Sequence, residues 1–187
     1  MIRLFTDASF IVRGKHAQIG LAVTVRDDAR VVSRITQAYT DPAITENKTI
    51  SGENHQIAEL RACLLGFEHL ASLKAQGWVW QCGRVDYTTD NAWVASKINR
   101  LRHGCYDPNG EAGAILACLQ EVWRRAGVVE VRVFRQSEAV SAEIRDCDTR
   151  SKRARNVLVD GVEQMPSAKK THVQKNKQKK NQWRKGR

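Results

Sequence analysis

The chain of 187 residues is long enough for one α/β domain with a short extension. Its 31 Lys and Arg outnumber 20 Asp and Glu, so the net charge of +11 excludes an acidic solvating protein and makes a polyanion the first partner to consider. With 42% hydrophobic residues the chain is not globally disordered, and no apolar run approaches the ~20 residues of a membrane span. The N-terminal segment reaches a charged residue, Asp7, too soon to be a signal peptide. We therefore expect a cytoplasmic protein without membrane association.

Three strands are expected before the first helix. Residues 2–6 alternate apolar and polar side chains and predict a strand that ends at Asp7. Residues 19–25 and 31–39 are two further β-type runs joined by a tight turn, so the three strands predict an antiparallel meander. The polar segment 40–54 contains Pro42 and Gly52, and it predicts a loop.

The second half of the chain alternates helices and strands. From residue 55 the apolar residues recur at helical spacing, which predicts a helix up to residue 75, and a strand over residues 85–89 leads to Asp90. The remaining predicted elements are a short helix that includes residues 93–101, a loop over 103–110, a helix over 111–126, a strand over 128–134 and a polar helix over 142–157. The order β-β-β-α-β-α-α-β-α predicts a mixed sheet with helices packed on its faces.

The basic charge is concentrated at the end of the chain. Residues 168–187 hold nine Lys or Arg and no acid, which leaves 22 basic and 20 acidic residues before them. We therefore expect a folded domain over residues 1–160 and a basic, disordered tail over 161–187. The tail could bind RNA or another nucleic acid by counterion release, or it could serve solubility alone. The lysines assigned to nucleic-acid binding are Lys169, Lys170, Lys175, Lys177, Lys179 and Lys180.

Four acidic residues occupy positions at which sites are often built. Asp7 and Asp90 each end a predicted strand, where crevices form beside helical crossovers. Glu59 lies early in the first helix among small and apolar neighbours, and Asp148 lies early in the last helix. Converging carboxylates repel each other, and hard cations such as Mg²⁺ or Mn²⁺ relieve that repulsion with oxygen ligands. Taken singly, each acid is also explained as a turn former, a helix-dipole partner or a solvated residue.

In their order and in the elements that carry them, these segments resemble the ribonuclease H family, type HI. The matching segments are Phe-Thr-Asp-Ala-Ser at 5–9, Ala-Glu-Leu-Arg-Ala at 58–62, Thr-Asp-Asn at 89–91 and Cys-Asp-Thr-Arg-Ser at 147–151. The resemblance covers residues 1–156 and implies an α/β, RNase H-like five-stranded mixed sheet, with three antiparallel strands followed by alternating helices and strands and with helices on both faces. Asp146 is the alternative to Asp148 as the fourth acid.

The resemblance also implies an activity. A member of this family is an endonuclease that hydrolyses the RNA strand of RNA/DNA hybrids by two-metal-ion catalysis, so the chain is expected to be a Mg²⁺-dependent ribonuclease H. The catalytic and metal-binding residues would be the four acids, which would hold two Mg²⁺ ions or Mn²⁺ in their place. Asn54, His55 and Gln56 would contact sugar and base edges in the minor groove, where the 2′-OH distinguishes RNA. The alternative for these three is that they only begin the helix.

Two departures from the family keep other functions open. The family often has a mobile His between the last strand and the last helix; this chain has none there, and Arg135 or Glu138 could partly substitute with slower turnover. The separation of 52 positions between Asp7 and Glu59 is also longer than usual.

A related nuclease or transposase core is disfavoured because those cores more often take their third acid from a late helix. The alternative of another class is a non-catalytic or weakly active nucleic-acid-binding module recruited through its Lys-rich tail. Oligomeric state stays open.

Overall fold

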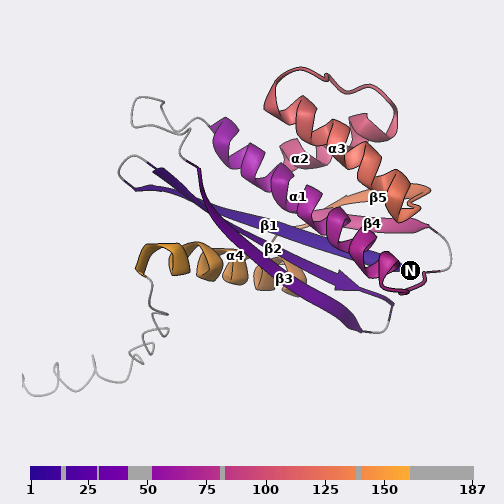
Figure 1. Ribbon diagram of the computed structural model, residues 1–187, viewed down its shortest axis with the longest axis horizontal. Helices are drawn as coiled ribbons and strands as arrows, with labels where there is room; N and C mark the ends of the chain where they lie inside the picture. Colours follow the sequence, from indigo (N-terminus) through magenta and orange to yellow (C-terminus); the bar gives the residue numbers. More distant parts are fainter. Residues whose placement is uncertain (14–15, 29, 42–51, 81–82, 138–139, 161–187) are drawn as a thin grey trace, which may run out of the picture.

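The computed structural model of the protein describes residues 1–13, 16–28, 30–41, 52–80, 83–137 and 140–160 (Figure 1). Within these ranges the elements are β1 (Ile2–Arg13), β2 (His16–Arg26), β3 (Val31–Asp41), α1 (Gly52–Ala75), β4 (Arg84–Thr89), α2 (Ala92–Arg102), α3 (Gly110–Ala126), β5 (Glu130–Arg135) and α4 (Ala142–Asp160). The element order is the predicted one. The predicted tail falls on residues outside the described ranges.

The strands form one mixed sheet in the order β3-β2-β1-β4-β5. β1 pairs antiparallel with β2, and β2 with β3, whereas β4 pairs parallel with both β1 and β5. β1 is longer than predicted, because its pairing with β2 continues to Arg13 while its pairing with β4 ends at Phe5. Asp7 therefore lies within β1, two residues beyond the last pair with β4, and the prediction that the strand ends at Asp7 was wrong.

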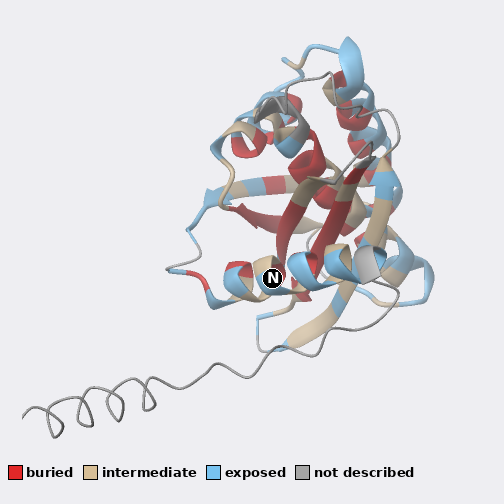
Figure 2. Cartoon of the chain, turned by 90° about the vertical axis from the view of Figure 1, so that its left-hand side faces the viewer, coloured by how far each residue is buried: buried red, intermediate tan, exposed pale blue. Residues whose placement is uncertain are grey.

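Helices cover both faces of the sheet. α1, α2 and α3 lie on one face and α4 on the other, so the predicted arrangement is confirmed (Figure 1). Buried residues are concentrated on the strands and on the inner sides of the helices (Figure 2). On the α1 side the fully buried Leu60, Phe67 and Leu70 pack in one cluster with Leu4 and Tyr87 of the sheet. Burial of each such side chain contributes about 1.5–3 kcal/mol, so this cluster fixes α1 against β1 and β4.

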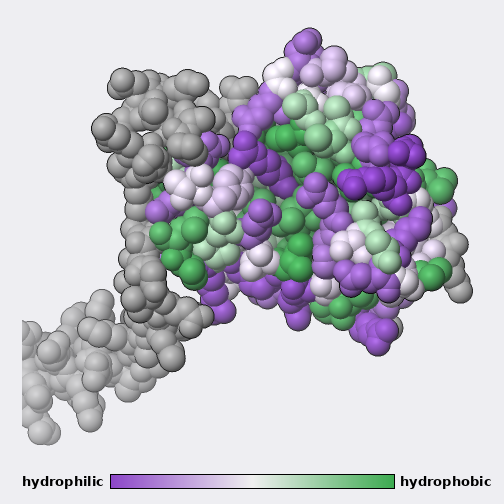
Figure 3. Space-filling view, in the orientation of Figure 1, coloured by the Kyte–Doolittle hydropathy of each residue, from purple (hydrophilic) through white to green (hydrophobic). Residues whose placement is uncertain are grey.

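The surface of the described residues is mixed in character. On the side seen in Figure 3, hydrophobic residues form several separate patches between hydrophilic ones. None of the described helices combines the length and the apolar composition that crossing a bilayer requires.

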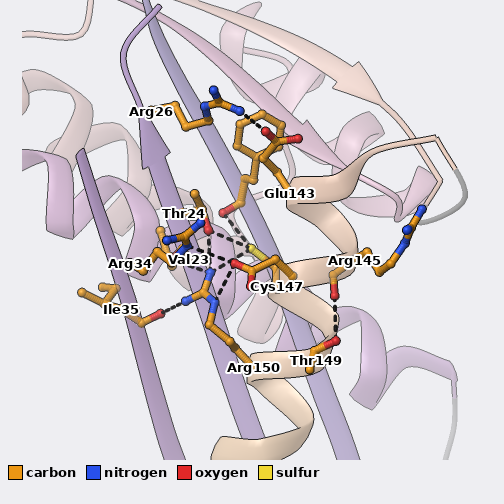
Figure 4. Close-up of polar contacts among 12 residues, drawn as sticks. Val23, Thr24, Arg26, Arg34, Ile35, Glu143, Arg145, Cys147, Thr149 and Arg150 are labelled. Atoms are coloured by element: carbon orange, nitrogen blue, oxygen red, sulfur yellow. Dashed lines mark hydrogen bonds and ion pairs between the residues drawn. The ribbon is translucent and has the colours of Figure 1, made fainter. Parts of the chain in front are cut away.

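Arg150 anchors α4 to the opposite face of the sheet (Figure 4). Its Nη1 donates to the Ile35 carbonyl at 3.1 Å and its Nη2 to the Val23 carbonyl at 3.0 Å, while its Nε donates to Asp146 Oδ2 at 3.0 Å. The same Asp146 oxygen accepts from Arg34 Nε at 3.2 Å. Because charge-assisted hydrogen bonds are directional, this network sets which side of α4 faces β2 and β3.

Gly20 sets how closely α4 approaches the sheet. A Cβ at this position of β2 would lie 2.0 Å from the Ser151 carbonyl oxygen and 2.7 Å from the Arg155 amide nitrogen. Any side chain would therefore push the helix backbone outward. The glycine brings the middle of α4, with Asp148 and Ser151, to the level of Asp7.

Candidate active site

The candidate site forms where β4 ends beside β1. The last parallel pair joins Phe5 to Thr88, and β4 ends one residue later, at Thr89. β1 continues past this point with only β2 as a neighbour, so an opening remains on the side that β4 has left. Crevices at the carboxyl ends of parallel strands are common binding sites for this reason. Asp7 of β1 and Asp90, which follows β4, both lie at this opening.

Glu59 reaches the same place from α1. Its neighbours Ala58 and Ala62 are buried and pack with Ala8 of β1, because small side chains let the helix lie close to the strand. One carboxyl oxygen from each of Asp7, Glu59 and Asp90 lies within 4.8 Å of the other two. Asp7 is 4% exposed and Glu59 is 2% exposed, whereas Asp90 is half-buried. The structure thus brings three of the four predicted acids into one cluster.

The cluster is electrostatically unfavourable without a cation. Burial raises the pKa of Glu59 well above its ordinary value, the charges of Asp7 and Asp90 raise it further, and a hydrogen bond from the Ala8 backbone only partly opposes them. Glu59 Oε2 is buried and has no hydrogen-bond partner among the described residues. A buried carboxylate oxygen without a donor, next to two other carboxylates, fits a hard divalent cation such as Mg²⁺.

Asp148 lies next to the cluster and not within it. Its charge contributes to the raised pKa of Glu59, so the two carboxyl groups are near each other. Lys152 Nζ contacts both Asp148 oxygens, at 2.5 and 2.7 Å. The alternative acid, Asp146, instead bonds to Arg34 and Arg150 on the β3 side of α4. The geometry therefore favours Asp148 over Asp146 as the fourth acid.

The residues predicted to touch nucleic acid are only partly described. His55 is exposed, and its Nε2 lies 3.7 Å from Glu59 Oε1, one turn along α1. Gln56 is half-buried beside it. The side chain of Asn54 and the whole of Glu138 lie outside the described residues. The same holds for the six assigned lysines, Lys169, Lys170, Lys175, Lys177, Lys179 and Lys180.

Two residues at the site, Ser151 and Lys152, were not assigned a role from the sequence, and a third, Arg135, was considered only as a partial substitute for a missing His. Ser151 is fully buried, and its hydroxyl donates to Asp7 Oδ2 at 2.7 Å. Ser151 and Lys152 lie three and four positions after Asp148, a spacing that places side chains on one helix face and could have indicated both. Arg135 ends β5, and its Nε donates to the Asp90 main-chain oxygen at 3.4 Å. The sequence pointed to this arginine only by its place between the last strand and the last helix, where it could partly substitute for the family's mobile His.

Comparison of the sequence with protein-family models and with curated proteins gives no match. Among solved structures, LC11-RNase H1 in complex with an RNA/DNA hybrid aligns with a TM-score of 0.59 at 15% identity, over 84% of this chain and 99% of that chain. RNase H1 from the archaeon Halobacterium salinarum gives 0.54 at 14% identity, over 86% and 98%. The N-terminal RNase H domain of a Mycobacterium tuberculosis protein gives 0.53 at 13% identity, over 82% and 98%. These similarities confirm the predicted fold.

Proposed function

We propose, starting from the ribonuclease H fold of the chain, that the protein is a Mg²⁺-dependent endonuclease that hydrolyses the RNA strand of RNA/DNA hybrids. The observation that carries this proposal is the cluster of Asp7, Glu59 and Asp90, whose carboxyl oxygens lie within 4.8 Å of one another. Burying several carboxylates side by side opposes folding, and groups of this kind are typical of functional sites. The hybrid bound to LC11-RNase H1 supports the same class of substrate.

The described acids divide naturally into two ligand sets. We assign Asp7, Glu59 and Asp90 to one Mg²⁺ ion, and Asp7, Asp90 and Asp148 to a second. Such ions, when bound, lower the pKa of a water molecule and neutralise the departing 3′ oxygen of the cleaved strand. The hydroxyl of Ser151 holds Asp7 Oδ2 at 2.7 Å, which fixes the orientation of the carboxylate that both sets share.

Lys152 must give up Asp148 before that acid can bind a metal. The ion pair joins residues four apart on one helix, and the Lys152 side chain is 52% exposed. Pairs at this helical spacing contribute about 0.3–0.5 kcal/mol when both groups are exposed, whereas the Asp148 side chain here is 17% exposed. A divalent cation carries twice the charge of the ammonium group and can therefore displace it.

The contacts that would select RNA lie at the start of α1. His55 and Gln56 stand one turn before Glu59, so a strand whose phosphate lies at the cluster would pass them. We propose that they contact its sugars, where the 2′-OH is the group that DNA lacks. Contacts to sugar and phosphate do not read bases, so low sequence specificity is expected.

Cleavage of labelled substrates side by side tests the proposal. RNA/DNA hybrid, duplex RNA, duplex DNA and single strands are incubated with Mg²⁺, Mn²⁺ or EDTA. We expect cleavage of the RNA strand of the hybrid with either metal and none in EDTA. An Asp7→Asn variant should lose cleavage and keep most of its affinity for the hybrid.

A wild-type protein that binds the hybrid and never cuts it with either metal would contradict the proposal. That outcome would support the non-catalytic module recruited through the Lys-rich tail. Cleavage of duplex DNA in preference to the hybrid would instead support a different nuclease on the same fold.

A further inference from the structure

Arg135 is held at the rim of the carboxylate cluster by both its backbone and its side chain. It is the last residue of β5 and pairs in register with Thr89, the last residue of β4. The Gln136 amide donates to the Thr89 carbonyl at 3.1 Å and keeps the two strand ends together. The exposed Arg135 side chain then donates from Nε to the Asp90 main-chain oxygen at 3.4 Å. The guanidinium group is thus adjacent to one of the three clustered acids.

This arginine is arranged differently from others in the fold. Arg132, three residues earlier on β5, forms an ion pair with Glu130 at 2.9 Å. Arg150 is tied to Asp146 and to two carbonyls. Arg135 contacts the main chain of Asp90 and forms no ion pair with any described residue; its one hydrogen bond there is to a main-chain oxygen. Its two Nη groups therefore remain available, and the Asp90 carboxylate remains with Asp7 and Glu59.

We propose that Arg135 binds a backbone phosphate of the strand that lies across the carboxylate cluster. The inference rests on the proposed function, and it names a substrate-binding residue for that site. A guanidinium presents its donors in a planar fork that matches two phosphate oxygens, which an ammonium group cannot do. Since a guanidinium keeps its proton in folded proteins, Arg135 contributes charge and hydrogen bonds and does not transfer a proton.

Binding to uncleaved hybrid separates this role from catalysis. All proteins carry Glu59→Gln, which is expected to stop cleavage, and a fluorescein-labelled RNA/DNA hybrid is titrated at KCl concentrations from about 50 to 200 mM. Adding Arg135→Ala should weaken binding about 5- to 20-fold and lower the slope of log affinity against log salt by about one. Arg135→Lys should restore the slope and only part of the affinity, because the charge remains and the fork does not.

Arg132→Ala is the matched control, because it removes an exposed arginine of the same strand that is already paired with Glu130. It should change affinity less than about twofold, as expected of an exposed group outside the contact. In otherwise wild-type protein, Arg135→Ala should raise KM more than it lowers kcat. Circular dichroism should show unchanged thermal unfolding for both variants.

Equal affinities and equal salt slopes for the Arg135→Ala and Arg132→Ala proteins would overturn the inference. If the wild-type protein still cleaves the hybrid in that case, the proposed function stands without it. If the wild-type protein neither binds nor cleaves the hybrid, both are wrong.

Discussion

Glu59 shows how a single residue can link stability to cation binding. Burial and the charges of Asp7 and Asp90 raise its pKa, so in EDTA the folded protein keeps this proton to a higher pH than the unfolded chain does. Between the two pKa values only the unfolded state ionises, so the free energy of unfolding falls as pH rises. Above the pKa of the folded state the loss is complete and stays constant.

Replacing Glu59 by Gln should remove this pH dependence. In EDTA at pH 8 we expect Glu59→Gln to raise the Tm by more than about 2 °C, the shift that about 1 kcal/mol produces in a chain of this size. At pH 4, below both pKa values, the two proteins should unfold alike. At pH 8, Mg²⁺ should raise the Tm of the wild type more than that of the variant. Glu68→Gln, on an exposed position of the same helix, is the control. Parallel stability curves for wild type and Glu59→Gln would contradict the role of the buried charge.

Asp148 and Asp146 differ by two positions and face different partners. Asp148→Asn should reduce hybrid cleavage more than about 100-fold, since loss of a ligand's outer partners alone costs 10–100-fold. Asp146→Asn should keep activity and lose stability by about 0.2–1 kcal/mol, because it breaks the contacts to Arg34 and Arg150. Cleavage rates and urea unfolding of the two variants check this. The reverse result would make Asp146 the fourth acid.

At the scale of elements, the placement of α4 decides whether Asp148 can reach the cluster. Gly20→Ala would put a methyl group 2.0 Å from the Ser151 carbonyl oxygen, and backbone atoms cannot move aside as a side chain can. We expect a loss of stability of about 1–3 kcal/mol from the displaced helix. We also expect a fall in cleavage beyond what unfolding explains, because the hydrogen bond from Ser151 to Asp7 lengthens. Activity measured well below the Tm separates the two effects.

Gly66→Ala is the matched substitution on the other face of the sheet. Its methyl group would meet side-chain carbons of Leu4 and Thr6 at 3.1 Å, and these can shift by a few tenths of an ångström. The change also gains about 1 kcal/mol of helix propensity, so little net loss is expected. If Gly66→Ala reduced cleavage as much as Gly20→Ala, the depth of α4 would not be the controlling feature.

Periodicity predicted the elements well and their junctions poorly. The order of strands and helices followed from local patterns, because each element must bury one face. The length of β1 did not, since its continuation to Arg13 depends on pairing with β2, which no local pattern records. The acids Asp7, Glu59 and Asp90 were predicted from their motifs. Arg135 was named only as a partial substitute for a missing His, because its contact with the Asp90 main chain depends on which strand ends lie side by side.

At the scale of the whole molecule, the charge is divided between a nearly neutral stretch, residues 1–167, and a basic end, residues 168–187. Residues 1–167 carry 22 basic and 20 acidic side chains, and residues 168–187 carry nine basic side chains and no acid. The domain alone therefore has little long-range attraction for a polyanion, while its cluster of carboxylates repels one until cations bind. If the protein acts on nucleic acid, residues 168–187 are the main source of non-specific affinity.

Deleting residues 168–187 should therefore weaken binding of the hybrid and make it less dependent on salt, while leaving the cleavage rate at saturating substrate unchanged. Each phosphate that the tail no longer neutralises should lower the slope of log affinity against log salt by about 0.9. The measurement is hybrid binding in the Glu59→Gln background over a range of KCl, with kcat determined separately in Mg²⁺. A full-length chain with Gln at the six assigned lysines controls for tail length, and it should change affinity and salt slope in the same direction as the deletion but by less, because Arg184, Lys185 and Arg187 remain. If binding and its salt dependence are the same with and without the tail, the segment has no role in substrate affinity, and the domain itself must supply the attraction.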